Sequence, residues 1–299
     1  MALVFVFIDG IGLDSAHANN PFACVPQPFL QALLGGPLIA ESVTYQPERH
    51  LLLKALDATL GVPGLPQSGT GQTALFAGIN AAQLVQRHQT HFPPTTLHET
   101  LRQRSILQRG RAFGTSAFAN AFDEGFWQAL ATRKLRKSAS VIAAEGAGVY
   151  FRTQHDLANG HALSWDITNH VMHQRHPDLI QPIDAFTAGM NLTILAHQHV
   201  ITLYETFLTD LVGHGRTTID TTEVVTRIDR LIGGILNHLR PHDSLIISSD
   251  HGNFERPHEK SHTTNPVPLL VVGPACDTLH HIHDISQVAD ALEVAMTHA

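Results

Sequence analysis

LVFVFIDGIG, residues 3–12, is the segment from which the architecture of this chain can be read. Its first six residues are apolar without interruption and rich in β-branched and aromatic side chains, which is typical of a strand buried on both faces. Asp9 follows this run directly, and Gly10 and Gly12 then turn the chain. The segment therefore predicts a central strand of a sheet that ends in an acidic side chain.

Two further apolar runs end in the same way. Residues 200–208 run into Asp210 through one threonine, and residues 244–249 run directly into Asp250. Residues 268–273 supply a fourth predicted strand. Because each of the three carboxylates follows a buried strand, we expect them to gather at one edge of the sheet.

Helical patterns alternate with these runs. The predicted helices cover residues 73–82, 185–197, 221–239 and 285–296. Strands that alternate with helices of this length favour an α/β fold, in which a mostly parallel sheet carries helices on both faces.

The middle of the chain departs from this alternation. We assign residues 1–86 and 183–299 to the α/β core, and we expect residues 87–182 to be partly core and partly a small cap inserted over the sheet edge. This middle segment carries a basic cluster at residues 133–137 and several aromatic side chains, namely Phe122, Phe126, Trp127, Tyr150 and Trp165.

Composition disfavours several classes of protein. The formal net charge of -7 provides no basic field for nucleic acid or an anionic membrane surface. Cys24 and Cys276 are too few for a disulfide framework. The apolar run at residues 3–8 is shorter than a signal-peptide core, and no apolar stretch approaches the roughly 20 residues of a membrane span. We therefore expect a cytoplasmic protein without a nucleic-acid or membrane partner, and its oligomeric state stays open.

Metal-ligand residue types gather in five short segments. They are Asp9, Ser68, Asp210 with His214, Asp250 with His251, and His262. Taken singly, each has an ordinary interpretation, such as a helix cap or a loop histidine. Their joint occurrence favours a two-metal hydrolytic or phosphoryl-transfer site.

Spacing within the segments is compatible with that interpretation. Asp210 and His214 are four positions apart, so one helical turn or a tight loop directs both at the same ion. Asp250 and His251 are adjacent and precede Gly252, where the backbone can bend. Such a pair suits two neighbouring ions, or one ion held through a bent backbone.

Ser68 begins the segment SGTGQ, residues 68–72, which lies between a Pro/Gly loop and a helix predicted to begin near Thr73. Exposed amides at a helix start favour an anion, and a hydroxyl there can attack a phosphorus atom. The alternative is a plain helix-capping hydroxyl. Coordination to a divalent ion would stabilise the serine alkoxide, which explains why a serine belongs among the ligands.

The segments together resemble a known family. The matching words are FIDGIG at 7–12, QSGTGQ at 67–72, DLVGHG at 210–215, SDHGN at 249–253 and SHTTNPVP at 261–268, and their order along the chain also agrees. The chain resembles the alkaline phosphatase superfamily, and within it the metalloenzymes cofactor-independent phosphoglycerate mutase and phosphopentomutase.

This resemblance implies roles for the candidate residues. Asp9, Ser68, Asp250 and His251 would surround one divalent ion, and Asp210, His214 and His262 would surround the other. Ser68 would be the phosphorylated nucleophile, with Thr70 as the runner-up. The mixture of carboxylates and imidazoles suits Mn²⁺ or Zn²⁺ better than Ca²⁺.

The chain also departs from the mutases. Gln72 stands where they carry a histidine, and the middle segment is shorter and offers fewer basic candidates for holding a substrate, namely Arg87, Arg133, Lys134, Arg136, Lys137 and Arg152. A smaller cap favours a phosphatase that acts on a small phosphorylated metabolite through a phosphoserine. A phosphomutase of the phosphoglycerate or phosphopentose type and a metal-binding module without turnover are the alternatives. No sulfatase-like motif supports cleavage of sulfate esters.

Overall fold

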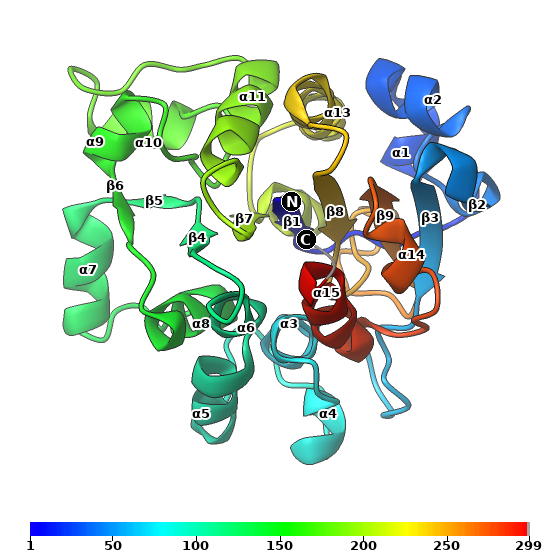
Figure 1. Cartoon of the computed structure of the whole chain (residues 1–299), viewed down its shortest axis with the longest axis horizontal. Coiled ribbons are helices and arrows are strands. Elements are labelled where there is room, and N and C mark those ends of the chain that lie inside the picture. Colours follow the sequence, from blue (N-terminus) through cyan, green and yellow to red (C-terminus); the bar gives the residue numbers. More distant parts are fainter. Residues whose placement is uncertain (298–299) are drawn as a thin grey trace.

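The computed structural model describes residues 1–297. Its main sheet has the strand order β2-β3-β9-β8-β1-β7-β4 (Figure 1). The strands are β1 (Leu3–Ile8), β2 (Thr44–Gln46), β3 (Leu51–Leu56), β4 (Ser116–Phe118), β7 (Ile201–Thr206), β8 (Ser244–Ser248) and β9 (Val267–Val272). The four predicted strands are all present, with β1 between β7 and β8 at the centre.

Strand direction corrects the expectation of a mostly parallel sheet in part. Strands β4, β7, β1 and β8 pair in parallel, whereas β8 with β9, β9 with β3 and β3 with β2 pair antiparallel. The sheet is therefore mixed, with β9 and β2 running against the other strands. Residues 249–266, which connect β8 to β9, form loops without a crossover helix, and a parallel return would require one.

Helices pack against the sheet from two sides. In Figure 1, α11 and α13 lie on one side of the central strands, and α3, α6, α8 and α15 lie on the other. The helices are α1 (Pro21–Cys24), α2 (Pro28–Leu34), α3 (Ser68–Ala77), α4 (Ala81–Leu84), α5 (Thr95–Arg104), α6 (Ile106–Gly110), α7 (Glu124–Ala131), α8 (Ala139–Ala147), α9 (Gln154–Ala158), α10 (His170–Arg175), α11 (Ala185–Ala196), α12 (Leu208–Gly213), α13 (Thr221–His238), α14 (Cys276–Leu279) and α15 (Val288–Thr297), with 3-10 turns η1 (Ala40–Ser42), η2 (Pro47–Arg49) and η3 (Ile285–Gln287).

The uninterrupted apolar run of β1 is explained by two separate cores. Leu3, Phe5 and Phe7 pack in one hydrophobic cluster with side chains of α3, α8 and α15. Val4, Val6 and Ile8 pack in a second cluster with side chains of α11 and α13. Because successive side chains of a strand point to opposite faces, every position of β1 has to be apolar.

The helix that follows Ser68 begins earlier than predicted. We expected a helix over residues 73–82, but α3 begins at Ser68, and it ends at Gly78 in the left-handed conformation (φ 68°). The glycines of residues 68–72 are typical of a loop. Gly71 is nevertheless helical, and a Cβ there would lie 2.7 Å from the backbone oxygen of Asp250, so it allows α3 to approach β8 closely.

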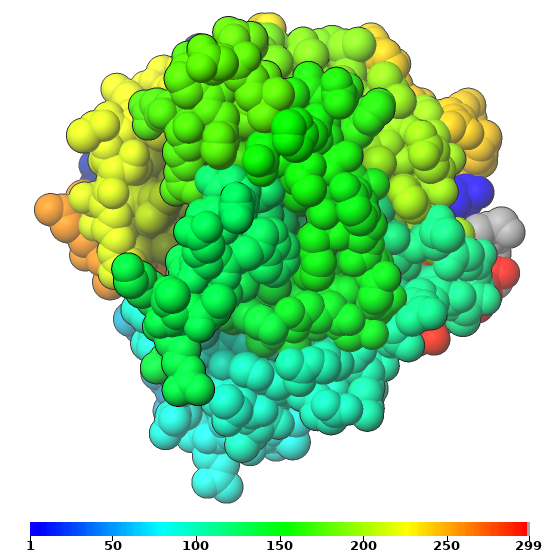
Figure 2. Space-filling model, turned by 90° about the vertical axis from the view of Figure 1, so that its left-hand side faces the viewer, coloured from blue at the N-terminus to red at the C-terminus, as the bar shows by residue number. Residues whose placement is uncertain are grey.

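The middle segment contributes to both the core and a smaller unit. Helices α5, α6 and α8 supply side chains to the main core. Residues 119–182 contain the two-stranded parallel sheet of β5 (Ala121–Phe122) and β6 (Arg152–Thr153), with a small cluster of their own that includes Leu157, Met172 and Ile180. Figure 2 shows these green residues across the middle of one face. The predicted domain boundaries stay a prediction.

Among the described helices, none has both the length and the apolar character needed to span a membrane.

Candidate metal centre

The register of the central strands brings three carboxylates to the same edge. Phe7 of β1 lies opposite Glu205 of β7 and Ser248 of β8. Asp9 and Asp250 each follow their strand by one or two residues, and Asp210 lies in the first turn of α12 directly after β7. Adjacent parallel strands therefore deliver the predicted acidic side chains to neighbouring positions.

Asp210, His214 and His262 form the first group. His214 Nε2 lies 3.1 Å from His262 Nε2 and 3.3 Å from Asp210 Oδ1, and His262 Nε2 lies 3.6 Å from Asp210 Oδ1. The Nδ1 atoms of the two histidines face the carbonyl oxygens of Lys260, at 3.0 Å, and Pro66, at 2.7 Å. If Nδ1 donates to these carbonyls, each Nε2 lone pair is free for a metal ion.

Asp9, Ser68, Asp250 and His251 form the second group. His251 Nε2 lies 3.0 Å from Ser68 Oγ, 3.4 Å from Asp9 Oδ1 and 3.4 Å from Asp250 Oδ2. Among the described residues, Asp9 Oδ1 and Asp250 Oδ2 are buried oxygens without a hydrogen-bond partner. Buried carboxylate oxygens are costly to leave unpaired, so this donor set fits a divalent cation.

The two groups adjoin each other. The rings of His251 and His262 stack with their centroids 3.7 Å apart. Ligand atoms of His251 lie within 4.8 Å of those of Asp9 and Asp250, and also of those of Asp210 and His262. The structure thus brings all seven predicted ligands into one cluster, whereas their division between two ions stays a prediction.

Electrostatics in the cluster reflect a concentration of negative charge. Burial raises the pKa of Asp9 well above its usual value, and the neighbouring carboxylates of Asp250 and Asp210 raise it further. Burial also acts on Asp210, but the hydrogen bond from His262 and the charge of His251 lower its pKa overall. Burial lowers the pKa of His251, which favours the neutral imidazole that a metal ion requires.

Ser68 and Thr70 occupy different environments. Ser68 is the first residue of α3, and its hydroxyl faces His251. Thr70 Oγ1 is engaged locally, because it donates to Gln67 O at 3.3 Å and accepts from Gln89 N at 3.2 Å. Ser68 lines the cavity beside the cluster, and Thr70 is absent from that lining. This geometry favours Ser68 over the runner-up, although the nucleophile stays a prediction.

Sequence reasoning missed two buried acidic residues. Glu205 lies inside β7, where a lone acid in an apolar strand was the only signal, and burial is the main cause that raises its pKa to about 8. Glu255 lies in the connection between β8 and β9 and is fully buried. Its carboxylate accepts from Gly12 N and Asn253 N, both at 2.8 Å, and from Asn265 Nδ2 at 3.0 Å, so it ties three motif-bearing loops together.

A cavity of about 480 Å³ opens beside the cluster. We call five of its residues the cleft floor: Asp9, Ser68, Gln72, Glu205 and Asp210. Gln72 Nε2 donates to Asp9 Oδ2 at 3.2 Å. We call six apolar residues the cleft wall: Phe122, Phe126, Leu135, Trp165, Met172 and Phe207. All but Phe207 come from the middle segment, so side chains of residues 119–182 lie over the floor.

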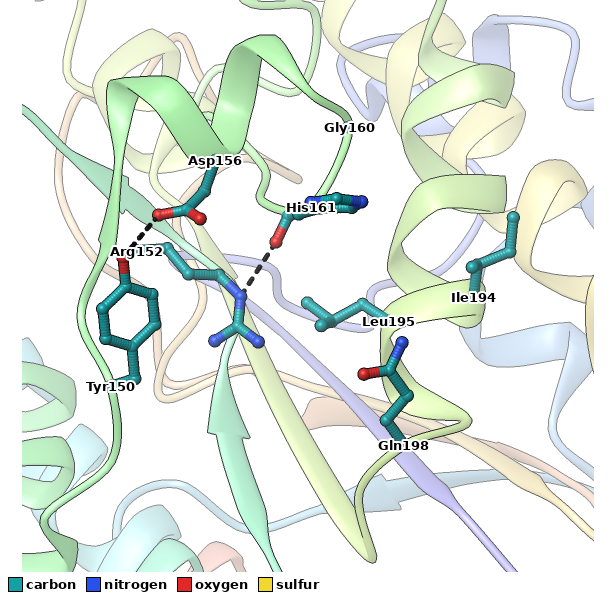
Figure 3. Close-up of a pocket in the computed structure, with 8 residues that line it drawn as sticks. All are labelled: Tyr150, Arg152, Asp156, Gly160, His161, Ile194, Leu195 and Gln198. Atoms are coloured by element: carbon teal, nitrogen blue, oxygen red, sulfur yellow. Dashed lines mark hydrogen bonds between the residues drawn. The ribbon is translucent and has the colours of Figure 1, made fainter.

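Most of the predicted substrate-holding cations lie elsewhere. Of the six basic candidates, Arg136 lines the cleft, together with Arg175, which sequence reasoning did not select. Arg152 instead lines a separate cavity of about 260 Å³ (Figure 3). There its Nε donates to His161 O at 2.9 Å and its Nη1 to Phe118 O at 3.1 Å, so backbone carbonyls hold the guanidinium away from the cleft.

Comparison with known sequences places this geometry in context. Residues 185–296 match the sequence model of the Metalloenzyme superfamily, and five of the predicted ligands, Asp210, His214, Asp250, His251 and His262, lie in this range. The 2,3-bisphosphoglycerate-independent phosphoglycerate mutase of Acaryochloris marina is 38% identical over 71 residues, which are 21% of this chain and 13% of that protein. A phosphopentomutase of Limosilactobacillus reuteri is 35% identical over 63 residues, 21% of this chain and 16% of that protein. The matches thus span less than a fifth of these relatives.

Solved structures share the fold over nearly the whole chain. The PH0037 protein from Pyrococcus horikoshii has a TM-score of 0.58 at 13% identity, with 100% of this chain and 98% of that chain covered. A cold-active alkaline phosphatase from Shewanella sp. has a TM-score of 0.54 at 12% identity, with 99% and 100% covered. At these identities the likeness concerns the fold.

The α/β fold of this chain resembles that of alkaline phosphatase. The predicted resemblance to alkaline phosphatase superfamily metalloenzymes is confirmed, including the likeness to phosphoglycerate mutase and phosphopentomutase.

Proposed function

We propose that the chain is a two-metal phosphatase that acts on a small phosphorylated metabolite through a phosphoserine at Ser68. One observation carries this proposal: Ser68 Oγ lies at the first turn of α3 and 3.0 Å from His251 Nε2, in the same cluster as two buried carboxylate oxygens without partners. A hydroxyl at a helix N-terminus beside metal ligands is suited to attack an anionic phosphorus centre.

Seven side chains would hold the ions. Asp9, Ser68, Asp250 and His251 would surround one, and Asp210, His214 and His262 would surround the other. Carboxylate oxygens mixed with imidazole nitrogens suit Mn²⁺ or Zn²⁺. When bound, the ions would lower the pKa of the Ser68 hydroxyl and offset the charge of the phosphoryl group.

The chain's own residues supply the rest of the reaction. The Ser68 hydroxyl loses its proton as Oγ bonds to phosphorus, the ester P–O bond breaks, and the departing oxygen takes up a proton from solvent to leave as an alcohol. A water molecule then attacks the phosphoserine, which releases inorganic phosphate and restores the serine. The positive end of the α3 helix dipole would favour the dianionic group at this position.

A phosphomutase is the second candidate, because the local sequence matches include two mutases. A mutase has to return the phosphoryl group to an acceptor while it excludes water. The cleft here offers few free cations to hold such an acceptor, and this favours hydrolysis. Release of free phosphate, measured against formation of an isomeric ester, separates the two reactions.

The decisive experiment compares Ser68→Ala with Thr70→Val after loading with Mn²⁺ or Zn²⁺. We expect Ser68→Ala to lose at least about 10³-fold in phosphatase kcat/KM while it keeps most of its metal, because the other ligands remain. Thr70→Val should stay within about 10-fold of wild type. Intact-mass analysis after a burst should find a single added phosphoryl group in wild type and none in Ser68→Ala.

Two results would contradict the proposal. Full activity in Ser68→Ala combined with inactivity in Thr70→Val would move the nucleophile to Thr70. Metal binding without phosphoserine or phosphate release over a range of phosphomonoesters would instead support a metal-binding module without turnover.

A further inference from the structure

Four of the six cleft-wall residues form two aromatic pairs. The rings of Phe122 and Phe126 lie with centroids 4.4 Å apart, and those of Trp165 and Phe207 lie 6.4 Å apart. All four line the cavity that contains Ser68, and each is partly exposed rather than packed away in the core. Partly exposed aromatic side chains around a cavity provide a surface that an apolar ligand can cover.

Two buried polar side chains on this side of the cavity, Asn120 and Asp123, are already engaged. Asn120 Nδ2 donates to Glu205 O at 2.8 Å, and its Oδ1 accepts from Glu205 N at 2.9 Å. Asp123 accepts from Phe126 N at 2.8 Å and from Arg175 Nη1 at 3.0 Å. A hydroxyl-rich substrate would lose its hydration shell against these two side chains without gaining equivalent hydrogen bonds from them.

The negative charge of Asp123 also disfavours a substrate with a second anionic group. Asp123 is 5% exposed and lines the cavity, so a second carboxylate on the substrate would meet a like charge. Arg175, the cation nearest to it, is bound to that same aspartate. The single phosphoryl group can be held at the floor, but the remainder of the substrate faces rings.

We infer that this cleft selects phosphomonoesters whose alcohol part is aromatic or otherwise apolar, over esters of glycerate or of sugars. This inference rests on the proposed function, because it assigns the substrate class of the same site. A cavity of about 480 Å³ exceeds what a phosphoryl group needs and leaves space for one ring system. Covering a ring with the wall removes apolar surface from water, and that gain is available only to an apolar substrate.

The test compares 2-phenylethyl phosphate with ethyl phosphate, using the metal-loaded full chain. Both esters release a primary alcohol, so the ratio of their kcat/KM values reports the phenyl ring rather than a difference in leaving group. We expect a ratio of at least about 10 in favour of the phenyl ester. We also expect 3-phosphoglycerate and ribose 5-phosphate to be no better than ethyl phosphate.

Two variants locate the selectivity. Phe126→Ala should lower the ratio several-fold, because its ring lines the cleft. Phe113→Ala is the control, since this aromatic side chain is 37% exposed and lies outside the cavity lining, and it should keep the wild-type ratio. Both esters are assayed on one preparation, so a partly unfolded variant still gives a valid ratio. Phe126→Leu provides a milder change if the alanine variant does not fold.

Binding separates the failure of this inference from the failure of the proposed function. Calorimetry with 2-phenylethylphosphonate and ethylphosphonate measures selectivity without turnover. If the phenyl compound binds more tightly but no ester releases phosphate, the inferred selectivity is supported and the proposed phosphatase activity is contradicted. If phosphate is released with a kcat/KM ratio near 1 for the two esters, or with a preference for 3-phosphoglycerate, the inferred selectivity is contradicted and the proposed phosphatase activity is supported.

Discussion

The cleft floor is assembled from charged and polar side chains of three segments that are far apart in sequence, whereas most of the cleft wall comes from one stretch, residues 119–182. Floor residues sit at strand ends and at a helix start, where the main sheet fixes them. Of the wall residues, Met172 belongs to the small cluster around Leu157, whereas Phe122, Phe126 and Phe207 pack against the edge of the main core. This difference suggests that the reaction and the choice of substrate are built by separate parts of the molecule.

Support from neighbouring side chains differs in the same way. At the floor, Glu255 joins the loops of Gly12, Asn253 and Asn265, so a change there displaces several ligand-bearing segments together. The wall aromatics pack on one another and on rings outside the wall, namely Phe118, Trp127 and Phe151, rather than holding ligand-bearing loops. We therefore expect floor substitutions to remove activity altogether and wall substitutions to change the preference for substrates.

The sharpest test of this division is Asp250→Ala set against Asp123→Asn. Asp250→Ala removes a fully buried carboxylate from the ligand cluster, and we expect low metal content and a loss of at least about 10³-fold in kcat/KM. Asp123→Asn changes a buried carboxylate of the same cavity that faces Arg175 and the start of α7. It should keep its metal and lose less than about 10-fold.

Elemental analysis and phosphate release measure both quantities. If Asp123→Asn loses its metal as completely as Asp250→Ala, the ligand cluster beside the floor and the segment that carries the wall are not separate units. If Asp250→Ala keeps full metal occupancy, the ligand assignment is wrong.

The sequence was informative where chemistry follows directly from a strand end. Asp9, Asp210 and Asp250 each interrupt an apolar run, so their place at the sheet edge could be predicted before the fold was known. The antiparallel direction of β9 could not, because it depends on a loop connection that carries no local signal. The start of α3 was also missed, because Gly71 is set by its contact with Asp250, which is remote in sequence.

Aromatic and basic side chains of the middle segment show a different limit. Phe122, Phe126 and Trp165 stand out in the sequence, but nothing local indicates that they face Ser68. Arg152 and Arg136 look equivalent in sequence, yet backbone carbonyls hold the first in another cavity. Which way such residues point is decided by the tertiary structure of residues 119–182.

A second test uses Glu205, the floor residue whose pKa burial raises to about 8. The folded protein keeps this proton to about pH 8, whereas the unfolded chain releases it near pH 4.5. Its stabilising contribution is therefore complete below about pH 4.5 and is lost as the pH rises to about 8. We expect Glu205→Gln, which stays neutral, to gain on the order of a few kcal/mol relative to wild type between pH 5 and pH 8.

Urea unfolding of metal-free protein at the two pH values measures this gain. Asp9 is present in both proteins, but the charge of Glu205 contributes to its raised pKa, so the difference between the two proteins reports Glu205 together with its effect on Asp9. Exposed Glu48 provides the control, and Glu48→Gln should follow the wild-type curve. An equal pH dependence in wild type and Glu205→Gln would show that this side chain is already ionised in the folded protein.

The smallest expected effect tests the mouth of the cleft. Arg136 is exposed and lines the cavity, and it forms no ion pair within residues 1–297. An exposed charge near the entrance attracts an anionic ester mainly during approach, so Arg136→Gln should lower kcat/KM by about 2- to 5-fold at 0.1 M ionic strength. The difference should shrink in 0.5 M NaCl, because screening shortens the range of the attraction. Lys134→Gln removes a charge from the same basic stretch outside the cavity lining and should have little effect. Equal losses of kcat/KM in both variants would mean that the whole basic stretch attracts substrate and that Arg136 has no special role at the cavity.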